Sequence, residues 1–145
     1  MSGSQRPASN FAEDEAAWPL IMVVDDVEDN RRVLSRRLMA AGFRCETCED
    51  GPSALARLAN GPLPDAVLMD YMMPDMSGVE ALKLLRETWN IEALPVLMVT
   101  ARDDDPTLVK SFEAGANDYV TKPISFVVLV ARLKFHLRSK LPRAA

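Results

Sequence analysis

The sequence predicts an α/β fold of the doubly wound type, in which helices cover both faces of a five-stranded parallel sheet. Short, continuous apolar runs, typical of strands buried on both faces, alternate along the chain with segments of helical periodicity. The chain of 145 residues is long enough for one domain with its own core, and its 48% hydrophobic content is ordinary for a globular protein. Strands and helices that alternate in this way form parallel sheets.

The first half of the chain is expected to contain three strands and two helices. Strands are expected at 20–24, 44–48 and 66–69, and helices at 30–41 and 52–59. The first and third strands are continuous apolar runs. The first helix has apolar residues at a helical spacing and is followed by a glycine, and the second is followed by an Asn-Gly-Pro turn. These signals place a chain reversal after each helix.

The second half repeats the alternation. Strands are expected at 95–99 and 118–120, with a helix at 105–114 between them. A preceding helix is expected to begin after Ser77, with Glu80 completing a capping box, and to extend as far as Trp89. The acidic run 103–105 is interpreted as a loop with a helix cap rather than as a second metal site.

The last segment is compatible with a strand or a helix. From 129 to 137 apolar residues fall at every second position, which is a strand period. One helical face is equally satisfied by residues 126, 130, 133 and 137. The alternating order of the elements and the length of the segment favour a helix.

The expected organisation is a lead-in at 1–17, a folded domain at 18–140 and a short tail at 141–145. No apolar run reaches the length of a membrane span, and the first residues lack the pattern of a secretory signal, so we expect a cytoplasmic location and no membrane partner. The net charge of −4 and the pI near 5.0 argue against a direct nucleic-acid partner.

The two cysteines, Cys45 and Cys48, form a C-x-x-C pattern. They fall in a predicted strand, where residues three apart face opposite sides. A zinc site would need two more ligands, and His136 is the only histidine. We therefore interpret both cysteines as structural.

Polar residues follow four of the five predicted strands at the point where each strand ends. They are Asp25, Asp26, Asp70, Thr100 and Lys122. The carboxyl ends of parallel strands share one edge of the sheet, where ligands bind. Three aspartates there would repel one another by about 4 kcal/mol per pair at 4 Å and a dielectric constant of 20, so a cation is expected to compensate. Each aspartate alone is equally consistent with a helix cap or a turn. Together they indicate a site for Mg²⁺, a phosphoryl group, or both.

At these strand ends the sequence resembles the receiver domain of two-component response regulators. The matching segments are 23–26, 68–78, 99–101 and 115–123, and the resemblance extends from Leu20 to Leu137. It implies a flavodoxin-like strand order 2-1-3-4-5. It also implies a signalling switch that is not an enzyme, apart from its own phosphorylation and dephosphorylation. The implied phosphodonor is a histidine kinase or a histidine phosphotransfer protein.

The resemblance implies a role for each residue of the site. Asp70 would be the phosphoacceptor. The Mg²⁺ ligands would be Asp25, Asp26, Asp70 and the backbone carbonyl of Met72. Lys122 would pair with a phosphoryl oxygen.

Three further roles follow from the same resemblance. Thr100 would bond another phosphoryl oxygen and act as a switch residue together with Tyr119. The bond before Pro123 would be cis. Arg102, two residues after Thr100, is expected to influence dephosphorylation by water.

The switch is expected to change the surface of the fourth helix, fifth strand and fifth helix, and so to control a partner or a fused output domain. The last helix carries more apolar residues than one buried stripe requires. We expect it to form a homodimer or partner interface. The residues assigned to that interface are Phe126, Val130, Leu133 and Leu137.

Several alternatives remain open at this point. The chain is compatible with a stand-alone receiver and with one domain of a longer regulator, such as a nucleotide cyclase or a hybrid kinase, whose receivers have a similar first-helix start, 27–31. A Mg²⁺-dependent phosphatase with an aspartate nucleophile is less favoured, because its acid/base aspartate would stand where this chain has Met72. A flavin carrier is disfavoured by the acidic first loop, and a pseudo-receiver by the full set of site residues.

Overall fold

The computed structural model describes residues 17–140. Five strands and five helices alternate along them, as the sequence predicts. They are β1 (Leu20–Val24), α2 (Glu28–Ala40), β2 (Arg44–Cys48), α3 (Gly51–Ala59), β3 (Ala66–Asp70), α4 (Gly78–Arg86), β4 (Val96–Thr100), α5 (Asp105–Glu113), β5 (Asp118–Thr121) and α6 (Phe126–His136). Apart from residue 17, the expected lead-in and the tail lie outside the described residues.

The strands form one parallel sheet in the order β2-β1-β3-β4-β5, which confirms the expected topology. The register aligns the carboxyl ends of the central strands. Val24, the last residue of β1, lies opposite Cys48 and Met69, and Asp70 lies opposite Val99. The segments that follow β1, β3, β4 and β5 therefore emerge at one edge of the sheet.

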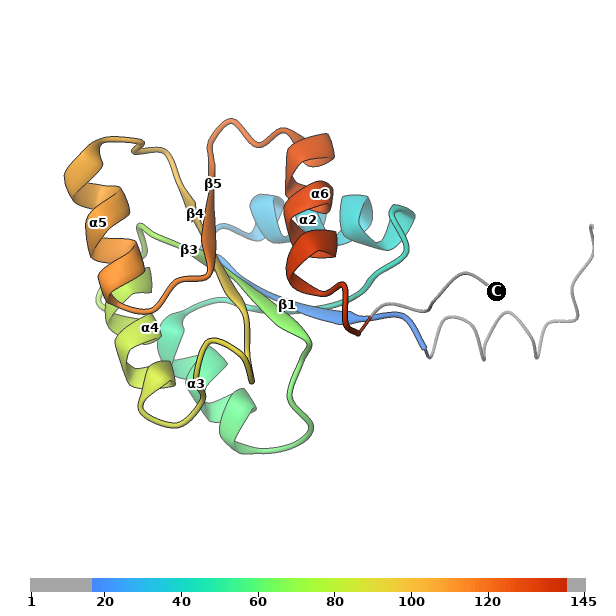
Figure 1. Ribbon diagram of the computed structural model, residues 1–145, viewed down its shortest axis with the longest axis horizontal. Coiled ribbons are helices and arrows are strands. Elements are labelled where there is room, and N and C mark those ends of the chain that lie inside the picture. The colour runs from blue at the N-terminus through green and yellow to red at the C-terminus, as the bar shows by residue number, and fades with distance from the viewer. Residues whose placement is uncertain (1–16, 141–145) are drawn as a thin grey trace, which may run out of the picture.

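Helices cover both faces of the sheet (Figure 1). Helices α2 and α6 lie on one face, and α3, α4 and α5 lie on the other. Successive residues of the central strands contribute to the two faces in turn: Ile21 packs beneath α2 and α6, and Met22 packs beneath α3 and α4. The two layers of core hold the sheet rigidly from both sides, so the strand ends present their side chains at fixed positions.

The two cysteines lie on opposite faces of β2, as expected. Cys45 packs against the core under α2 and α6, and Cys48 packs against the core under α3 and α4. Both thiols are free, and burial raises the pKa of each. This environment supports a structural interpretation, because thiols with a raised pKa are poor nucleophiles and poor metal ligands.

Two predicted helix boundaries differ from the structure by two residues or more. Helix α2 begins at Glu28 rather than at residue 30, because its first-turn acids favour the positive end of the helix dipole. Helix α4 ends at Arg86, and Trp89 packs onto the core from the segment that follows the helix. The capping box of Ser77 and Glu80 is present.

The last segment is a helix, but its assigned interface residues face inward. Leu133 and Leu137 are completely buried, and Phe126 and Val130 pack against the same core under α2 and α6. Leu133 and Leu137 therefore cannot contribute to an interface, whereas Phe126 and Val130 remain partly exposed. The outward face of α6 instead carries Val127, which is 83% exposed, with the exposed residues Val128, Ala131 and Phe135.

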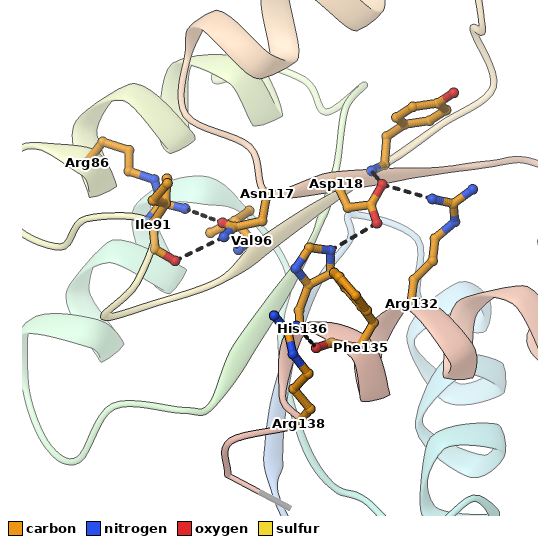
Figure 2. A network of polar contacts seen from close by, with 10 residues as sticks. Arg86, Ile91, Val96, Asn117, Asp118, Arg132, Phe135, His136 and Arg138 are labelled. Atoms are coloured by element: carbon orange, nitrogen blue, oxygen red, sulfur yellow. Dashed lines mark hydrogen bonds and ion pairs between the residues drawn. The ribbon is translucent and has the colours of Figure 1, made fainter.

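At the amino-terminal edge of the sheet, polar contacts connect α4 and α6 to the start of β5 (Figure 2). The guanidinium group of Arg86, at the end of α4, donates to the side-chain oxygen of Asn117 at 2.9 Å, and the Asn117 amide donates to the carbonyl of Ile91. The next residue, Asp118, accepts hydrogen bonds from Arg132 and pairs with His136, both on α6.

Within the described residues, no helix has both the length and the apolar character needed to cross a bilayer.

Candidate functional site

The predicted acidic residues come together at the carboxyl edge of the sheet. Asp25 and Asp26 follow β1, and Asp70 ends β3. Carboxylate oxygens of these three residues lie within 4.8 Å of one another. Lys122, which follows β5, reaches into this cluster, whereas Thr100 lies buried at the end of β4. The sheet register thus brings together residues that are nearly 100 positions apart in the sequence.

Asp70 lies at the centre of this cluster. It is only 4% exposed, and the Lys122 ammonium donates a hydrogen bond of 3.2 Å to its Oδ1 atom. Burial raises the pKa of the Asp70 carboxyl, and the charge of Asp25 raises it further. The charge and hydrogen bond of Lys122 act in the opposite direction without cancelling these effects. The site therefore holds excess negative charge, which a cation would relieve.

Asp70→Asn is expected to stabilise the metal-free fold at neutral pH. The folded-state pKa of Asp70 is raised, so its ionisation costs stability. This cost is absent below the unfolded pKa of about 3.9 and is fully present above the folded pKa. The gain, on the order of 1 kcal/mol, should therefore vanish as the pH falls through this window. Urea denaturation with a chelator at neutral and acidic pH measures it, and an equal effect at both pH values would contradict the prediction.

Asp25 is held by contacts that the sequence did not reveal. It is 2% exposed, and its Oδ1 atom accepts the backbone N–H of Val27 at 2.8 Å. The side-chain amide of Asn30 lies 3.3 Å from Oδ2, and Arg31 donates to the backbone carbonyl of Asp25 at 2.7 Å. The only signal for these contacts in the sequence was the pair of polar residues Asn30 and Arg31 at the start of the predicted helix. Their reach back to Asp25 depends on the loop geometry.

Thr100 is 1% exposed, and its hydroxyl oxygen accepts the backbone N–H of Arg102 at 2.9 Å. The Arg102 side chain pairs with Asp104 at 3.0 Å. Asp104 in turn caps α5 by accepting the backbone N–H of Thr107. The predicted helix cap in the acidic run is therefore confirmed, and Arg102 and Thr100 are positioned by the same loop.

Tyr119 does not join the acidic cluster. It is half-buried on β5, where its ring packs edge-on against Phe112 with centroids 6.0 Å apart, and the Arg132 guanidinium lies 5.7 Å from its centroid. Burial alone would raise the pKa of the neighbouring Asp118, but hydrogen bonds from His136, the Tyr119 backbone and Arg132 hold it below its usual value. Tyr119 thus contacts Phe112 on α5 and lies near Arg132 on α6, and β5, which carries it, runs between these two helices in Figure 1.

The loops beside Asp70 and Lys122 complete the site. The side chain of Met72 points to solvent and is 63% exposed, so only its backbone is available to the cluster. The Lys122–Pro123 peptide bond is cis. The backbone N–H of Lys122 donates to the carbonyl of Thr100 at 2.8 Å, which links the ends of β4 and β5.

Comparisons with known proteins agree with this architecture. The family model of the response regulator receiver domain matches residues 21–134. The chain is 41% identical over 121 residues to response regulator PleD of Caulobacter vibrioides, an alignment that covers 83% of this chain and 26% of PleD. It is 40% identical over 124 residues to the phosphate regulon transcriptional regulatory protein PhoB of Rhizobium meliloti, covering 86% of this chain and 54% of PhoB. The chain therefore spans about a quarter to a half of these relatives.

Solved structures show the same fold. The chemotaxis protein CheY4 of Vibrio cholerae superimposes with a TM-score of 0.76 at 29% identity, over 83% of this chain and 99% of CheY4. The receiver domain of Francisella response regulator 1452 gives a TM-score of 0.76 at 29% identity, over 85% of this chain and 99% of that one. With the matched segment spanning nearly the whole sheet and every helix, the chain belongs to the response regulator receiver domain family.

Proposed function

We propose that this receiver domain accepts a phosphoryl group on Asp70 in a Mg²⁺-dependent reaction with a histidine kinase or a histidine phosphotransfer protein. The observation that carries the proposal is the position of Asp70, a buried carboxylate in contact with the Lys122 ammonium and beside two further aspartates. Phosphoryl transfer depends mainly on positioning and on neutralisation of charge. The buried carboxylate supports the first, and Lys122 together with a bound cation would provide the second.

The carboxylate of Asp70 acts as the nucleophile. One of its oxygens attacks phosphorus, the bond between phosphorus and the donor imidazole nitrogen breaks, and the electron pair of that bond leaves with the imidazole. The product is an acyl phosphate. Lys122 then pairs with a phosphoryl oxygen, and the hydroxyl of Thr100 donates to another after rotation of its side chain.

The donor set fits Mg²⁺, which prefers carboxylate and carbonyl oxygens. Asp25, Asp26, Asp70 and the backbone carbonyl of Met72 would hold it. When bound, it would neutralise charge on the phosphoryl oxygens. The excess negative charge around Asp70 and the mutual approach of three carboxylates both support this assignment.

The output is proposed to act through α5, β5 and α6. Phosphorylation adds negative charge and acceptor oxygens, which bias Thr100 and Tyr119 towards a second arrangement. Tyr119 contacts Phe112 on α5 and lies near Arg132 on α6, so its movement would alter both helices. The outward apolar residues of α6, Val127 and Phe135 among them, would then contact a second copy, a partner or a fused output domain.

The whole protein is proposed to be a cytoplasmic signalling protein. The share of PleD and PhoB that the chain covers supports a receiver that works as one part of a longer regulator. PhoB is named a transcriptional regulatory protein, which suggests control of transcription as one kind of output. A tethered output domain would contact the outward surface of α6 described above.

Incubation with Mg²⁺ and acetyl phosphate, followed by intact mass spectrometry, tests the phosphoacceptor. We expect the wild-type chain to gain one phosphoryl group and to lose it in alkali, because acyl phosphates are labile. We expect no gain in Asp70→Asn, and none in the wild-type chain when a chelator is present. Asp75→Asn is the matched control, because Asp75 is an exposed aspartate in the following loop. Sedimentation velocity on the same samples tests whether phosphorylation causes two copies to associate through the outward surface of α6.

Phosphorylation of Asp70→Asn, or phosphorylation that does not require a divalent cation, would contradict the proposed chemistry. If neither acetyl phosphate nor any of a panel of purified histidine kinases phosphorylates the wild-type chain, the proposal is wrong. A sedimentation coefficient that stays the same after phosphorylation would remove the homodimer from the proposed outputs.

A further inference from the structure

The N-cap residue and the first turn of α2 make three kinds of contact with Asp25. The backbone N–H of Val27 donates to Oδ1 at 2.8 Å, and Arg31 donates to the backbone carbonyl at 2.7 Å. The amide nitrogen of Asn30 faces the whole carboxylate, 3.3 Å from Oδ2 and 3.5 Å from Oδ1. Among the described residues, Asn30 provides the one side-chain hydrogen bond to the Asp25 carboxylate.

This contact opposes a specific electrostatic problem. Asp25 is 2% exposed and its carboxylate lies close to those of Asp26 and Asp70. Without a cation, three like charges favour any rotation that moves the carboxylates apart. The Asn30 amide opposes that rotation together with the backbone N–H of Val27, because both donate to the Asp25 carboxylate in the orientation shown.

The chemical type of residue 30 matters as much as its position. An amide donates N–H groups without a positive charge. A lysine or arginine at the same place would neutralise the cluster and compete with a divalent cation. Asn30 therefore orients Asp25 while leaving the negative charge of the cluster available.

We propose that Asn30 is a positioning residue that sets the Mg²⁺ affinity of this site by orienting Asp25. This inference rests on the metal site of the proposed function, and it assigns to Asn30 a role in binding rather than in chemistry. Groups that hydrogen-bond a carboxylate ligand commonly contribute a factor of about 10 to metal affinity.

Direct metal binding provides the first test. Mn²⁺ serves as the probe, because electron paramagnetic resonance measures its free concentration without any phosphodonor. We expect the Kd for Mn²⁺ to rise by about tenfold in Asn30→Ala and in Asn30→Leu, which keeps the bulk of the side chain. Asn60→Ala is the matched control, since Asn60 also donates one side-chain hydrogen bond, to the carbonyl of Ala56, far from the site.

The phosphorylation rate with acetyl phosphate separates positioning from a general loss of structure. In Asn30→Ala the Mg²⁺ concentration that gives half the maximal rate should rise by about the same tenfold, while the maximal rate at saturating Mg²⁺ stays within about twofold of the unmodified chain. A damaged fold would instead lower the maximal rate at every Mg²⁺ concentration.

The outcomes separate this inference from the proposed function. A Kd for Mn²⁺ that stays within about twofold of the unmodified chain in both Asn30 variants overturns the inference, whatever the phosphorylation rates are. If the unmodified chain binds Mn²⁺ and the variants bind it about tenfold more weakly, the inference holds even where no phosphodonor modifies Asp70. If the unmodified chain binds no Mn²⁺, both proposals are wrong.

Discussion

Gly78→Ala is expected to destabilise the domain by about 3 kcal/mol, near the upper end of the range for overpacked core positions. Gly78 is buried at the start of α4, and its backbone N–H donates to the carbonyl of Tyr71 at 3.0 Å. A Cβ atom there would overlap the backbone carbonyl oxygen of Asp70 and lie 2.9 Å from the terminal methyl group of Met98. The methionine can move, but the backbone of a central strand cannot.

Urea denaturation of the metal-free protein measures this effect, and Gly51→Ala is its control. A Cβ atom at Gly51 would lie 2.7 Å from the Sδ atom of Met76, whose flexible side chain can move, and 3.2 Å from the Cβ atom of Ala81, where a small shift is enough. We therefore expect a loss of about 1 kcal/mol. Because the clash at Gly78 displaces the main chain of Asp70, the rate of phosphorylation should fall as well. Equal free energies of unfolding for the two variants would contradict the argument.

The residues at the strand ends could be predicted because buried parallel strands are visible in the sequence. A continuous apolar run that stops at an aspartate, as at Asp25 and Asp70, marks both the strand and its carboxyl end. The parallel arrangement then requires these ends to meet at one edge. The fold and the gathering of the acidic residues thus follow from local patterns and one topological rule, and the receiver motifs specify the order of the strands.

The orientation of α6 could not be predicted in the same way. Its sequence is apolar on more than one face, so the pattern does not distinguish the stripe that contacts the sheet from the stripe that faces solvent. The assignment of Leu133 and Leu137 to an interface was wrong for this reason, since both are completely buried. Only the packing of α6 against the sheet identifies Val127 and Phe135 as its outward residues.

Side-chain hydrogen bonds between distant segments were also beyond the sequence. Asn30 and Arg31 resemble ordinary polar residues at a helix start, and Arg86 resembles a cation that favours the end of a helix dipole. Their functions in the structure depend on which carbonyl and carboxylate oxygens the loops bring within reach. No periodicity or propensity encodes that information, because it arises from tertiary geometry.

Arg86 is the clearest example, and its guanidinium group joins the two loops at the amino-terminal edge of the sheet (Figure 2). Its Nε atom donates to the carbonyl of Gly115 at 2.8 Å and Nη2 donates to the side chain of Asn117 at 2.9 Å. Its Nη1 atom faces three carbonyl oxygens at 2.8–3.1 Å, those of Trp89, Asn90 and Leu94. Burial lowers the pKa of Arg86. The ordinary pKa of a guanidinium group is so high that Arg86 nevertheless stays charged.

Arg86→Ala should therefore destabilise the domain by about 4 kcal/mol, because it leaves several partly buried carbonyl oxygens without a donor. Arg86→Lys should recover only a minor part of this loss, since one ammonium group cannot span acceptors on both loops. Arg36→Ala, at an exposed position on α2, is the control and should change the free energy of unfolding by less than about 0.5 kcal/mol. Full recovery in Arg86→Lys would show that charge, rather than the geometry of the guanidinium group, holds the two loops together.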